Sequence, residues 1–227
     1  LLNPTALSAG GTDTCVIDDT GVVCWGQDQF EHSMVPEEVI NPTVIALGAN
    51  DVCAAGDNGI SCWGNLGIGN TPSTISNPTA IAIGSHHACA LGDNGLTCWG
   101  SNEIGQSSVP DGLSNPIAIS ALGNNTCVLD DNGVRCWGYD PFEETLVPDL
   151  INPIAIAAGH HSCAIGDNGL ECWGRNDVGQ ATVPVTLSNP TAVSVGLLHT
   201  CAVDDEGVHC WGRPNEGQTT VPPILMN

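Results

Sequence analysis

Residues 84–110 read GSHHACALGDNGLTCWGSNEIGQSSVP, and relatives of this stretch recur along the whole chain. A Cys-Trp-Gly tripeptide marks each copy, and an Asn-Pro pair opens each copy. The tripeptide tryptophans are Trp25, Trp63, Trp99, Trp137, Trp173 and Trp211. A fixed period of this length predicts a repeat architecture. The six repeats are about 3–40, 41–76, 77–114, 115–151, 152–188 and 189–227.

The third repeat shows which elements to expect. Alternating apolar residues over 79–83 predict one strand, and residues 87–91 and 96–99 predict two more around the turn sequence Gly-Asp-Asn-Gly. An extended piece ending at Val109-Pro110 predicts a fourth, edge strand, because proline cannot donate to a ladder. Four antiparallel strands per repeat favour an all-β, six-bladed β-propeller over a linear β-solenoid.

Residues 1–227 are expected to form one propeller domain. An inner-type strand over 4–8 and an outer-type strand over 219–221 lie near the two ends of the chain. Pairing these N- and C-terminal strands would close the ring and leave no open sheet edge.

Each Cys-Trp-Gly follows another cysteine by nine residues, across the turn sequence. Opposed residues in a hairpin are close enough for a disulfide, whereas zinc sites usually need cysteines two to four residues apart. Metal binding and free thiols are the weaker alternatives. The expected bridges are Cys15–Cys24, Cys53–Cys62, Cys89–Cys98, Cys127–Cys136, Cys163–Cys172 and Cys201–Cys210. Persistent disulfides require an oxidising compartment, so we expect a secreted, extracellular or cell-surface protein.

The chain is strongly acidic. It has 25 acidic residues, three arginines, no lysine and a formal net charge of −22. Nucleic acid is an unfavourable partner, because its phosphates are held mainly by Lys and Arg. Anionic membrane surfaces are disfavoured for the same reason, and no apolar run is long enough for direct membrane insertion.

The stretch 84–110 resembles the regulator-of-chromosome-condensation repeat, whose units carry His-Ser-x-Ala-Leu and Trp-Gly-x-Asn-x-x-Gly-Gln. Residues 173–184 and 217–222 are similar to the secreted bacterial propeller-type β-lactamase inhibitory proteins. The six periods and paired cysteines depart from this resemblance, since related members usually have seven blades and lack these cysteines. The resemblance implies a scaffold that binds proteins through its loops. The nucleotide-exchange activity of the nuclear member is not carried over, because fold alone does not transfer function.

Two of the loops after Trp-Gly lack the Gly-Gln pair and carry the chain's only phenylalanines, with its single tyrosine beside one of them. Aromatic side chains amid carboxylates indicate a contact surface, since aromatic anchors dominate interface energetics. The alternative is that each Phe fills the space left by the missing turn. The candidate binding residues are Asp28, Phe30, Glu31, Tyr139, Asp140, Phe142, Glu143 and Glu144.

Other polar positions have structural interpretations that we favour over metal binding. His87, His161 and His199 share one repeat position with Asp13, Asp51 and Asn125, which indicates a hydrogen-bonding slot. The pairs Asp18-Asp19, Asp130-Asp131 and Asp204-Asp205 could bind Ca²⁺, but turn chemistry explains them equally well. We predict no metal or other cofactor. The six tryptophans are expected to pack between blades, and Asn124 lies in a glycosylation sequon.

No nucleophile–base or phosphate-loop motif is present, so no catalytic residue is predicted and the chain is not expected to be an enzyme. We expect an extracellular protein-interaction or structural module that binds a protein partner or itself. The alternatives are an inhibitor of a secreted or periplasmic enzyme, such as a β-lactamase, and a carbohydrate-binding module.

Overall fold

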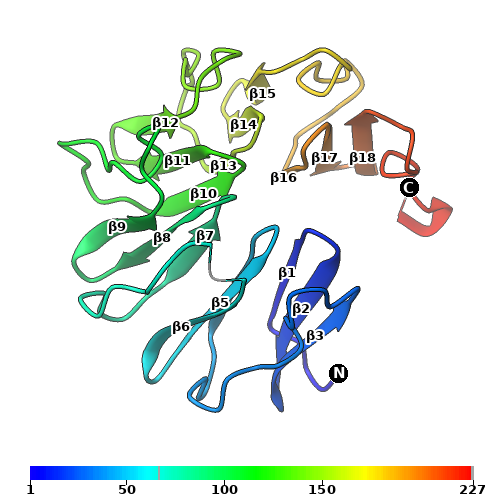
Figure 1. The fold of residues 1–227 in the computed structure, drawn as a ribbon. Coiled ribbons are helices and arrows are strands. Elements are labelled where there is room, and N and C mark those ends of the chain that lie inside the picture. The colour runs from blue at the N-terminus through cyan, green and yellow to red at the C-terminus, as the bar shows by residue number, and fades with distance from the viewer. Residues whose placement is uncertain (66, 226–227) are drawn as a thin grey trace. The chain divides into compact units, whose positions relative to one another are not determined.

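A computed structural model describes residues 1–65 and 67–225. These residues form six antiparallel sheets of three strands each, one sheet per repeat. The chain divides into two compact units, Leu1–Asp111 and Gly112–Asn227, called unit 1 and unit 2. Each unit holds three sheets, and each is described here by itself (Figure 1).

Unit 1 contains the first three sheets, coloured blue to green in Figure 1. The first strand of each sheet contacts the first strand of the next, β1 with β4 and β4 with β7. The sheets are β1 (Ala6–Gly10), β2 (Asp13–Asp18) and β3 (Gly21–Gly26); β4 (Val44–Leu47), β5 (Asp51–Gly56) and β6 (Gly59–Gly64); β7 (Ala80–Ile83), β8 (His87–Gly92) and β9 (Gly95–Gly100).

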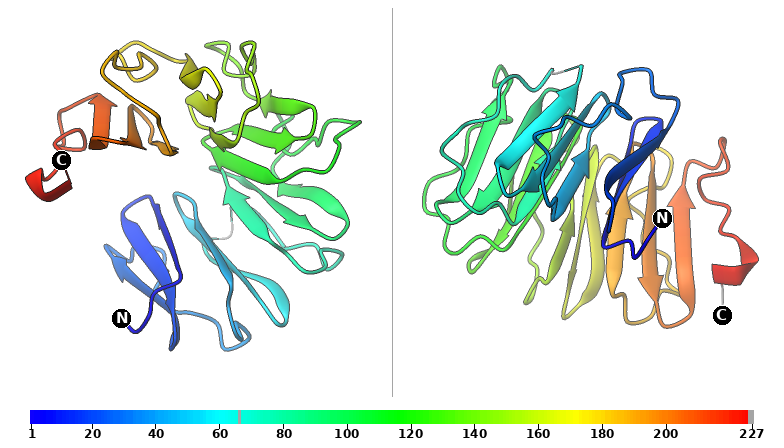
Figure 2. Two further views of the ribbon diagram at one scale, coloured as in Figure 1. Left: turned by 180° about the vertical axis from the view of Figure 1, so that it is seen from behind. Right: turned by 90° about the horizontal axis from the view of Figure 1, so that it is seen from below.

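Unit 2 repeats this arrangement, with β10 against β13 and β13 against β16. Within each sheet the three strands run side by side, as Figure 2 shows in two further views. The sheets are β10 (Ala118–Leu122), β11 (Asn125–Asp130) and β12 (Gly133–Gly138); β13 (Ala155–Ala157), β14 (His161–Gly166) and β15 (Gly169–Gly174); β16 (Ala192–Val195), β17 (His199–Asp204) and β18 (Gly207–Gly212).

The hairpin register follows from the turn sequence. In the third sheet Cys89 faces Cys98 and Gly92 faces Gly95, as the sequence predicts. Gly95 has a φ of 88°, a conformation in which any side chain is strained. All six cysteine pairs are opposed in this way and form disulfides, with Cα atoms 4.0–4.1 Å apart. The middle strands β5 and β8 are buried except at their last residue, and Cys53, Ala88 and Ala90 share one packed cluster.

Each Asn-Pro pair ties the start of a repeat to its own hairpin turn. The six asparagines have φ between 47° and 50°, and the side-chain amide of each donates to a turn aspartate. Asparagine tolerates this left-handed conformation better than most residues. We call this contact the Asn–Asp clamp. The pairs are Asn3–Asp19, Asn41–Asp57, Asn77–Asp93, Asn115–Asp131, Asn152–Asp167 and Asn189–Asp205.

The predicted fourth strand of each blade is wrong. Residues 101–110 contain no strand; residues 103–107 form turns, in which the amide of Gly105 donates to Asn102 O at 3.3 Å and that of Ser108 donates to Gly105 O at 3.0 Å. Backbone groups bonded within the loop, together with Pro110, leave few donors for a ladder. Residues 219–221 are likewise no strand, and a short helix, Pro223–Leu225, follows them. Without a strand at 219–221, the predicted pairing of N- and C-terminal strands is wrong in the described residues, because β1 pairs only with β2. Closure of the ring by other contacts, and with it the single closed domain, stays a prediction. Residues 226 and 227, the end of the last predicted repeat, lie outside the described part.

Candidate functional site

The loops that follow Cys-Trp-Gly, here called Trp-Gly loops, share one internal design. In the fifth sheet's loop Gly179 has a φ of 80°, and the next residue, Gln180, is fully buried. Its side-chain oxygen accepts a hydrogen bond from Val178 N at 3.0 Å. Gln106 does the same for Ile104 N at 3.1 Å in the third loop. The glutamine therefore fills the loop from inside.

The fourth Trp-Gly loop, residues 139–147, keeps this design with different residues, and we call it the Phe142 loop. Glu143 takes the glycine place with a φ of 61°. Glu144 takes the glutamine place, is 2 % exposed, and accepts from Phe142 N at 2.8 Å. Trp173 Nε1 of the next sheet donates to Glu144 O at 2.8 Å. Glu144 is thus an internal support of the loop and does not face solvent.

A side-chain clasp closes the same loop. Asp140 accepts from Thr145 N at 2.9 Å and from Thr145 Oγ1 at 2.6 Å. In the fifth loop Asn176 holds Ala181 N in the same way at 3.0 Å. Together with the buried Glu144, this clasp fixes the loop backbone before any partner binds.

The fixed loop presents large side chains to solvent. Tyr139 is 50 % exposed, Phe142 49 % and Leu146 61 %. Glu143 is exposed between them in sequence. Leu146 stands where the third and fifth loops have Ser108 and Thr182, so this loop is more apolar than those two loops. Asp140 and Pro141 are exposed as well, so six residues of this loop face solvent, and the sequence analysis did not name two of them, Pro141 and Leu146.

Arg175, the first residue of the next Trp-Gly loop, covers the Phe142 ring. Its guanidinium carbon lies 5.3 Å from the ring centroid, the geometry of a cation–π contact. Its Nε and Nη2 donate to the two carboxylate oxygens of Asp177, both at 2.8 Å. This hydrogen bonding lowers the pKa of Asp177 to about 2 and raises the pKa of Arg175. The rarity of arginine in the chain was a signal that could have singled out Arg175.

The first Trp-Gly loop, residues 27–36, holds its phenylalanine differently. Asp28 forms the clasp with Ser33 N at 2.8 Å and Ser33 Oγ, and these bonds lower its pKa. Phe30 is half-buried, with its ring 6.0 Å from the ring of His32. Glu31 is exposed with a φ of 59°, again in the glycine place. The loop-filling interpretation thus describes Phe30 better than Phe142. The two loops belong to different units, and the expectation that their repeats stand opposite each other stays a prediction.

His32 occupies the internal glutamine place of this first loop. It is fully buried, its Nδ1 lies 3.0 Å from Asp13 Oδ2, and its backbone oxygen accepts from Trp63 Nε1 at 2.9 Å. The sequence analysis did not single out His32. The alignment of the Trp-Gly loops could have done so, because His32 is the one histidine among the residues that take the glutamine place.

The polar slot before the first cysteine of each hairpin is a hydrogen-bonding position. His161 Nε2 lies 2.6 Å from Thr200 Oγ1 of the next sheet, and Asn125 Nδ2 donates to Gly159 O at 3.1 Å. Burial lowers the pKa of both His87 and His161 to about 4, and it also lowers the pKa of His199. These histidines are neutral packing groups at physiological pH.

The carboxylates of the acidic turns accept hydrogen bonds from neighbouring backbone and side-chain groups of the protein. Asp18 accepts from Leu2 N, Thr20 N and Thr20 Oγ1, which lowers its pKa. Asp130 and Asp204 accept from the corresponding amides of Ser114 and Ser188. Over the described part of the chain, no three His, Cys, Asp or Glu side chains are grouped to hold a metal ion.

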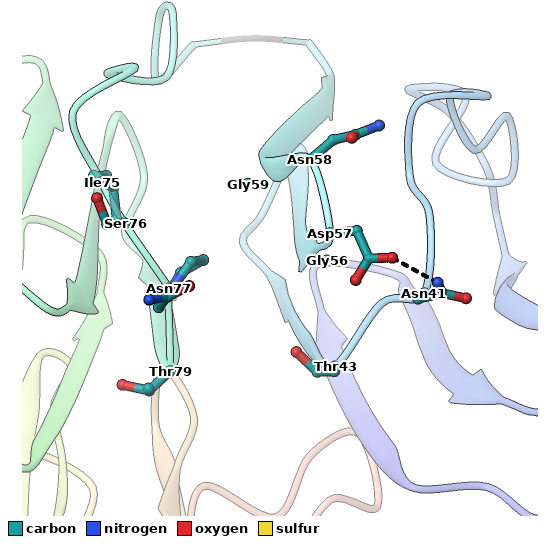
Figure 3. A pocket seen from close by; sticks show the side chains of 11 residues that line it. Asn41, Thr43, Gly56, Asp57, Asn58, Gly59, Ile75, Ser76, Asn77 and Thr79 are labelled. Carbon is teal, nitrogen blue, oxygen red and sulfur yellow. Dashed lines mark hydrogen bonds between the residues drawn. The ribbon is translucent and has the colours of Figure 1, made fainter.

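A shallow hollow of about 630 Å³ lies beside the β5–β6 turn in unit 1 (Figure 3). Asp57 in its wall accepts from Asn41 Nδ2 at 2.6 Å, and Asn77 on the opposite wall donates to Asp93 at 2.5 Å. These polar groups form Asn–Asp clamps, so the hollow is a by-product of the repeat and does not present an organised ligand site.

The tryptophans serve mainly as packing residues. Trp63, Trp99 and Trp137 are buried, and Trp211 Nε1 donates to Gln180 O at 3.0 Å. Trp25 differs, with 47 % of its surface exposed. Asn124 of the sequon is half-buried in the β10–β11 turn, where its backbone oxygen accepts from Tyr139 N at 3.1 Å.

Repeated three-stranded antiparallel sheets, each followed by a Trp-Gly loop, define the chain as a β-propeller repeat protein. Residues 79–106 and 191–218 match the Regulator of chromosome condensation (RCC1) repeat. Comparison with curated protein sequences gives no match.

Solved structures show the same fold at low sequence identity. Prp20p of Saccharomyces cerevisiae aligns over 98 % of this chain and 75 % of its own, with 17 % identity and a TM-score of 0.77. The ectodomain of the receptor kinase CR4 from Physcomitrella patens aligns over 93 % and 65 %, with 24 % identity and a TM-score of 0.75. The CRINKLY WD40 ectodomain of the Arabidopsis thaliana receptor kinase ACR4 aligns over 91 % and 78 %, with 24 % identity and a TM-score of 0.73. The fold is that of RCC1-like propellers.

Proposed function

We propose that this chain is an extracellular, non-enzymatic protein-interaction module that binds its partner through the Phe142 loop. The supporting observation is the half-exposed Phe142 on a loop that Glu144 and Asp140 hold in place. A large aromatic side chain on a rigid backbone is typical of an interface anchor, because little conformational entropy is lost on binding.

The disulfides support the proposed extracellular location. All twelve cysteines pair, one bridge per sheet, which an oxidising compartment maintains. Two of the structures with the same fold are receptor-kinase ectodomains. Prp20p, another protein with this fold, binds Gsp1p and histones, so the fold supports protein binding in that protein. No helix in the described residues is long and apolar enough to cross a membrane.

The test is capture of partners from the secreted proteins of the source cells. Wild type, Phe142→Ala and Ile104→Ala are immobilised and the bound proteins quantified by mass spectrometry. Ile104 holds the same loop place in the third repeat and is 41 % exposed, so it is a matched control. At least one protein should be retained by wild type and Ile104→Ala but lost from Phe142→Ala. If no retained protein depends on Phe142, this loop is not the binding surface.

An inhibitor of a secreted enzyme is a narrower form of the same proposal, and the same observation favours it. Rigid loops with one exposed anchor suit insertion into an enzyme cleft. Titration of β-lactamases with wild type and Phe142→Ala tests it, and inhibition independent of Phe142 contradicts a role for this loop.

A further inference from the structure

We infer that the partner segment bound by the Phe142 loop is basic, with Lys or Arg side chains placed over Phe142 and Leu146. This inference rests on the proposed function, and it names the chemical class of the partner. It follows from the charges around the exposed rings, the contact already made by Arg175, and the charge of the whole chain.

The charges around the loop are mostly negative. Asp140 and Glu143 are exposed, while Glu144 and Asp177 lie on the same loop and the next one. Against these four carboxylates stands the guanidinium of Arg175, which Asp177 already binds through two hydrogen bonds. In the described part of the chain the donors of these two loops bind Asp140, Glu144 and Asp177, and none binds the Glu143 carboxylate. An incoming cation would therefore find the exposed Glu143 carboxylate without a partner.

The Phe142 ring already shows that it can hold a guanidinium, since Arg175 lies over it at 5.3 Å. Tyr139, half-exposed, offers a second ring of the kind that attracts ammonium and guanidinium groups. Leu146 is 61 % exposed and provides an aliphatic surface for the long stems of Lys or Arg. The exposed Glu143 carboxylate on the same loop provides a partner for a charged end.

The charge of the whole chain selects the same class of partner. With a net charge of −22 and no lysine, the surface repels acidic proteins. A second copy of this chain carries the same charge, so self-association through this loop is disfavoured. A basic segment is attracted over a distance of about one Debye length, roughly 8 Å at physiological salt.

The test is selection of random dodecapeptides displayed on phage against the immobilised full chain, followed by affinity measurements on the enriched peptides. The expected peptides carry net positive charge, with Lys or Arg next to aliphatic residues. Phe142→Ala should weaken their binding roughly tenfold or more, as truncation of an anchor does. Glu143→Lys should weaken their binding by about two- to fivefold, which is the affinity change expected for loss of an exposed ion pair. Ile104→Ala and Glu103→Lys on the third loop should leave binding unchanged.

The alternative outcomes separate the two proposals. Enriched peptides that depend on Phe142 but are neutral or acidic overturn the inference of a basic partner and leave the binding loop intact. Basic peptides that depend on Phe142 but bind Glu143→Lys as well as wild type overturn the role of the acidic side chain and leave the binding loop intact. Enriched peptides of any charge that bind Phe142→Ala as well as wild type contradict the proposed function itself.

Discussion

The guanidinium carbon of Arg175 lies 5.3 Å from the centroid of the Phe142 ring, across two successive Trp-Gly loops. Because the chain has only two phenylalanines, para-fluorophenylalanine labelling gives two fluorine NMR signals. Arg175→Ala should shift and broaden the Phe142 signal and leave the Phe30 signal in place, since only Phe142 loses a covering cation. The stability loss should be about 0.5–2 kcal/mol, because the variant loses the cation–π contact and the exposed ion pair with Asp177 together. Two unchanged signals would show that Arg175 does not order the ring.

The buried Asp13–His32 pair should couple more strongly than a pair of equal length in which one partner is partly exposed. His209 Nε2 lies 3.0 Å from Asp204, the separation found for His32 and Asp13, but the His209 side chain is 30 % exposed. A double-mutant cycle with Asp13→Asn and His32→Gln should give a coupling of about 1–3 kcal/mol, since breaking a buried pair strands a polar group. The corresponding cycle at Asp204 and His209 should give a smaller coupling, because solvent screens the partly exposed His209. Equal couplings in urea unfolding would contradict the role of burial.

Each disulfide should stabilise its sheet. Replacing Cys89 and Cys98 together by alanine removes one bridge that closes a loop of about ten residues, and the chain-entropy argument gives a loss of about 2–3 kcal/mol. Urea unfolding without reductant measures it, with intact mass checking that the other five bridges remain. An unchanged midpoint would mean that the hairpin turn alone fixes the register.

Stability should fall on acidification between pH about 6.5 and about 4. Burial lowers the pKa of His87 and His161 from 6.5 to about 4, so in this range the unfolded chain binds more protons than the folded chain. Each histidine contributes up to about 3 kcal/mol to the free energy of unfolding. This contribution is fully present above pH 6.5 and is lost as the pH falls towards 4.

His161→Gln should flatten the pH dependence of the unfolding free energy, whereas His86→Gln at an exposed position should not. Asp18, Asp130 and Asp204, whose pKa values are lowered, add a further loss when they are protonated at still lower pH. A flat wild-type profile between pH 6.5 and 4.5 would contradict buried neutral histidines.

The Asn–Asp clamp contains two separable contributions, conformation and hydrogen bond. Asn77 has a φ of 47° and donates to Asp93 at 2.5 Å. Asn77→Gly loses the hydrogen bond but tolerates the conformation, whereas Asn77→Ala loses both. We expect the alanine variant to be less stable than the glycine variant by about 1 kcal/mol in thermal or urea unfolding, the cost of the left-handed region for a residue with a Cβ. The reverse order would show that the backbone at Asn77 relaxes freely.

Local sequence patterns predicted much of the fold. The spacing of Cys89 and Cys98 around Gly-Asp-Asn-Gly fixes the hairpin register, because opposed positions in a tight turn are determined by loop length alone. The fourth strand could not be predicted in this way. Residues 101–110 have extended-looking composition, but their amides bond to Asn102 and Gly105 inside the loop. The hydrogen bonds within the loop favour turns over a strand, and strand propensities of single residues do not take these bonds into account.

The Phe142 loop also combines features that the sequence determines with features that only the packing decides. From the sequence alone, the repeat period, the disulfide pairing and the unusual loops with Phe30 and Phe142 could be determined, because each depends on residues close together in the chain. Only the tertiary structure decided that Glu144 turns inward, that Phe30 is half-buried, and that Arg175 of the next repeat covers Phe142. Those outcomes depend on packing between neighbouring sheets, where residues about thirty positions apart compete for the same space and the same hydrogen-bond partners.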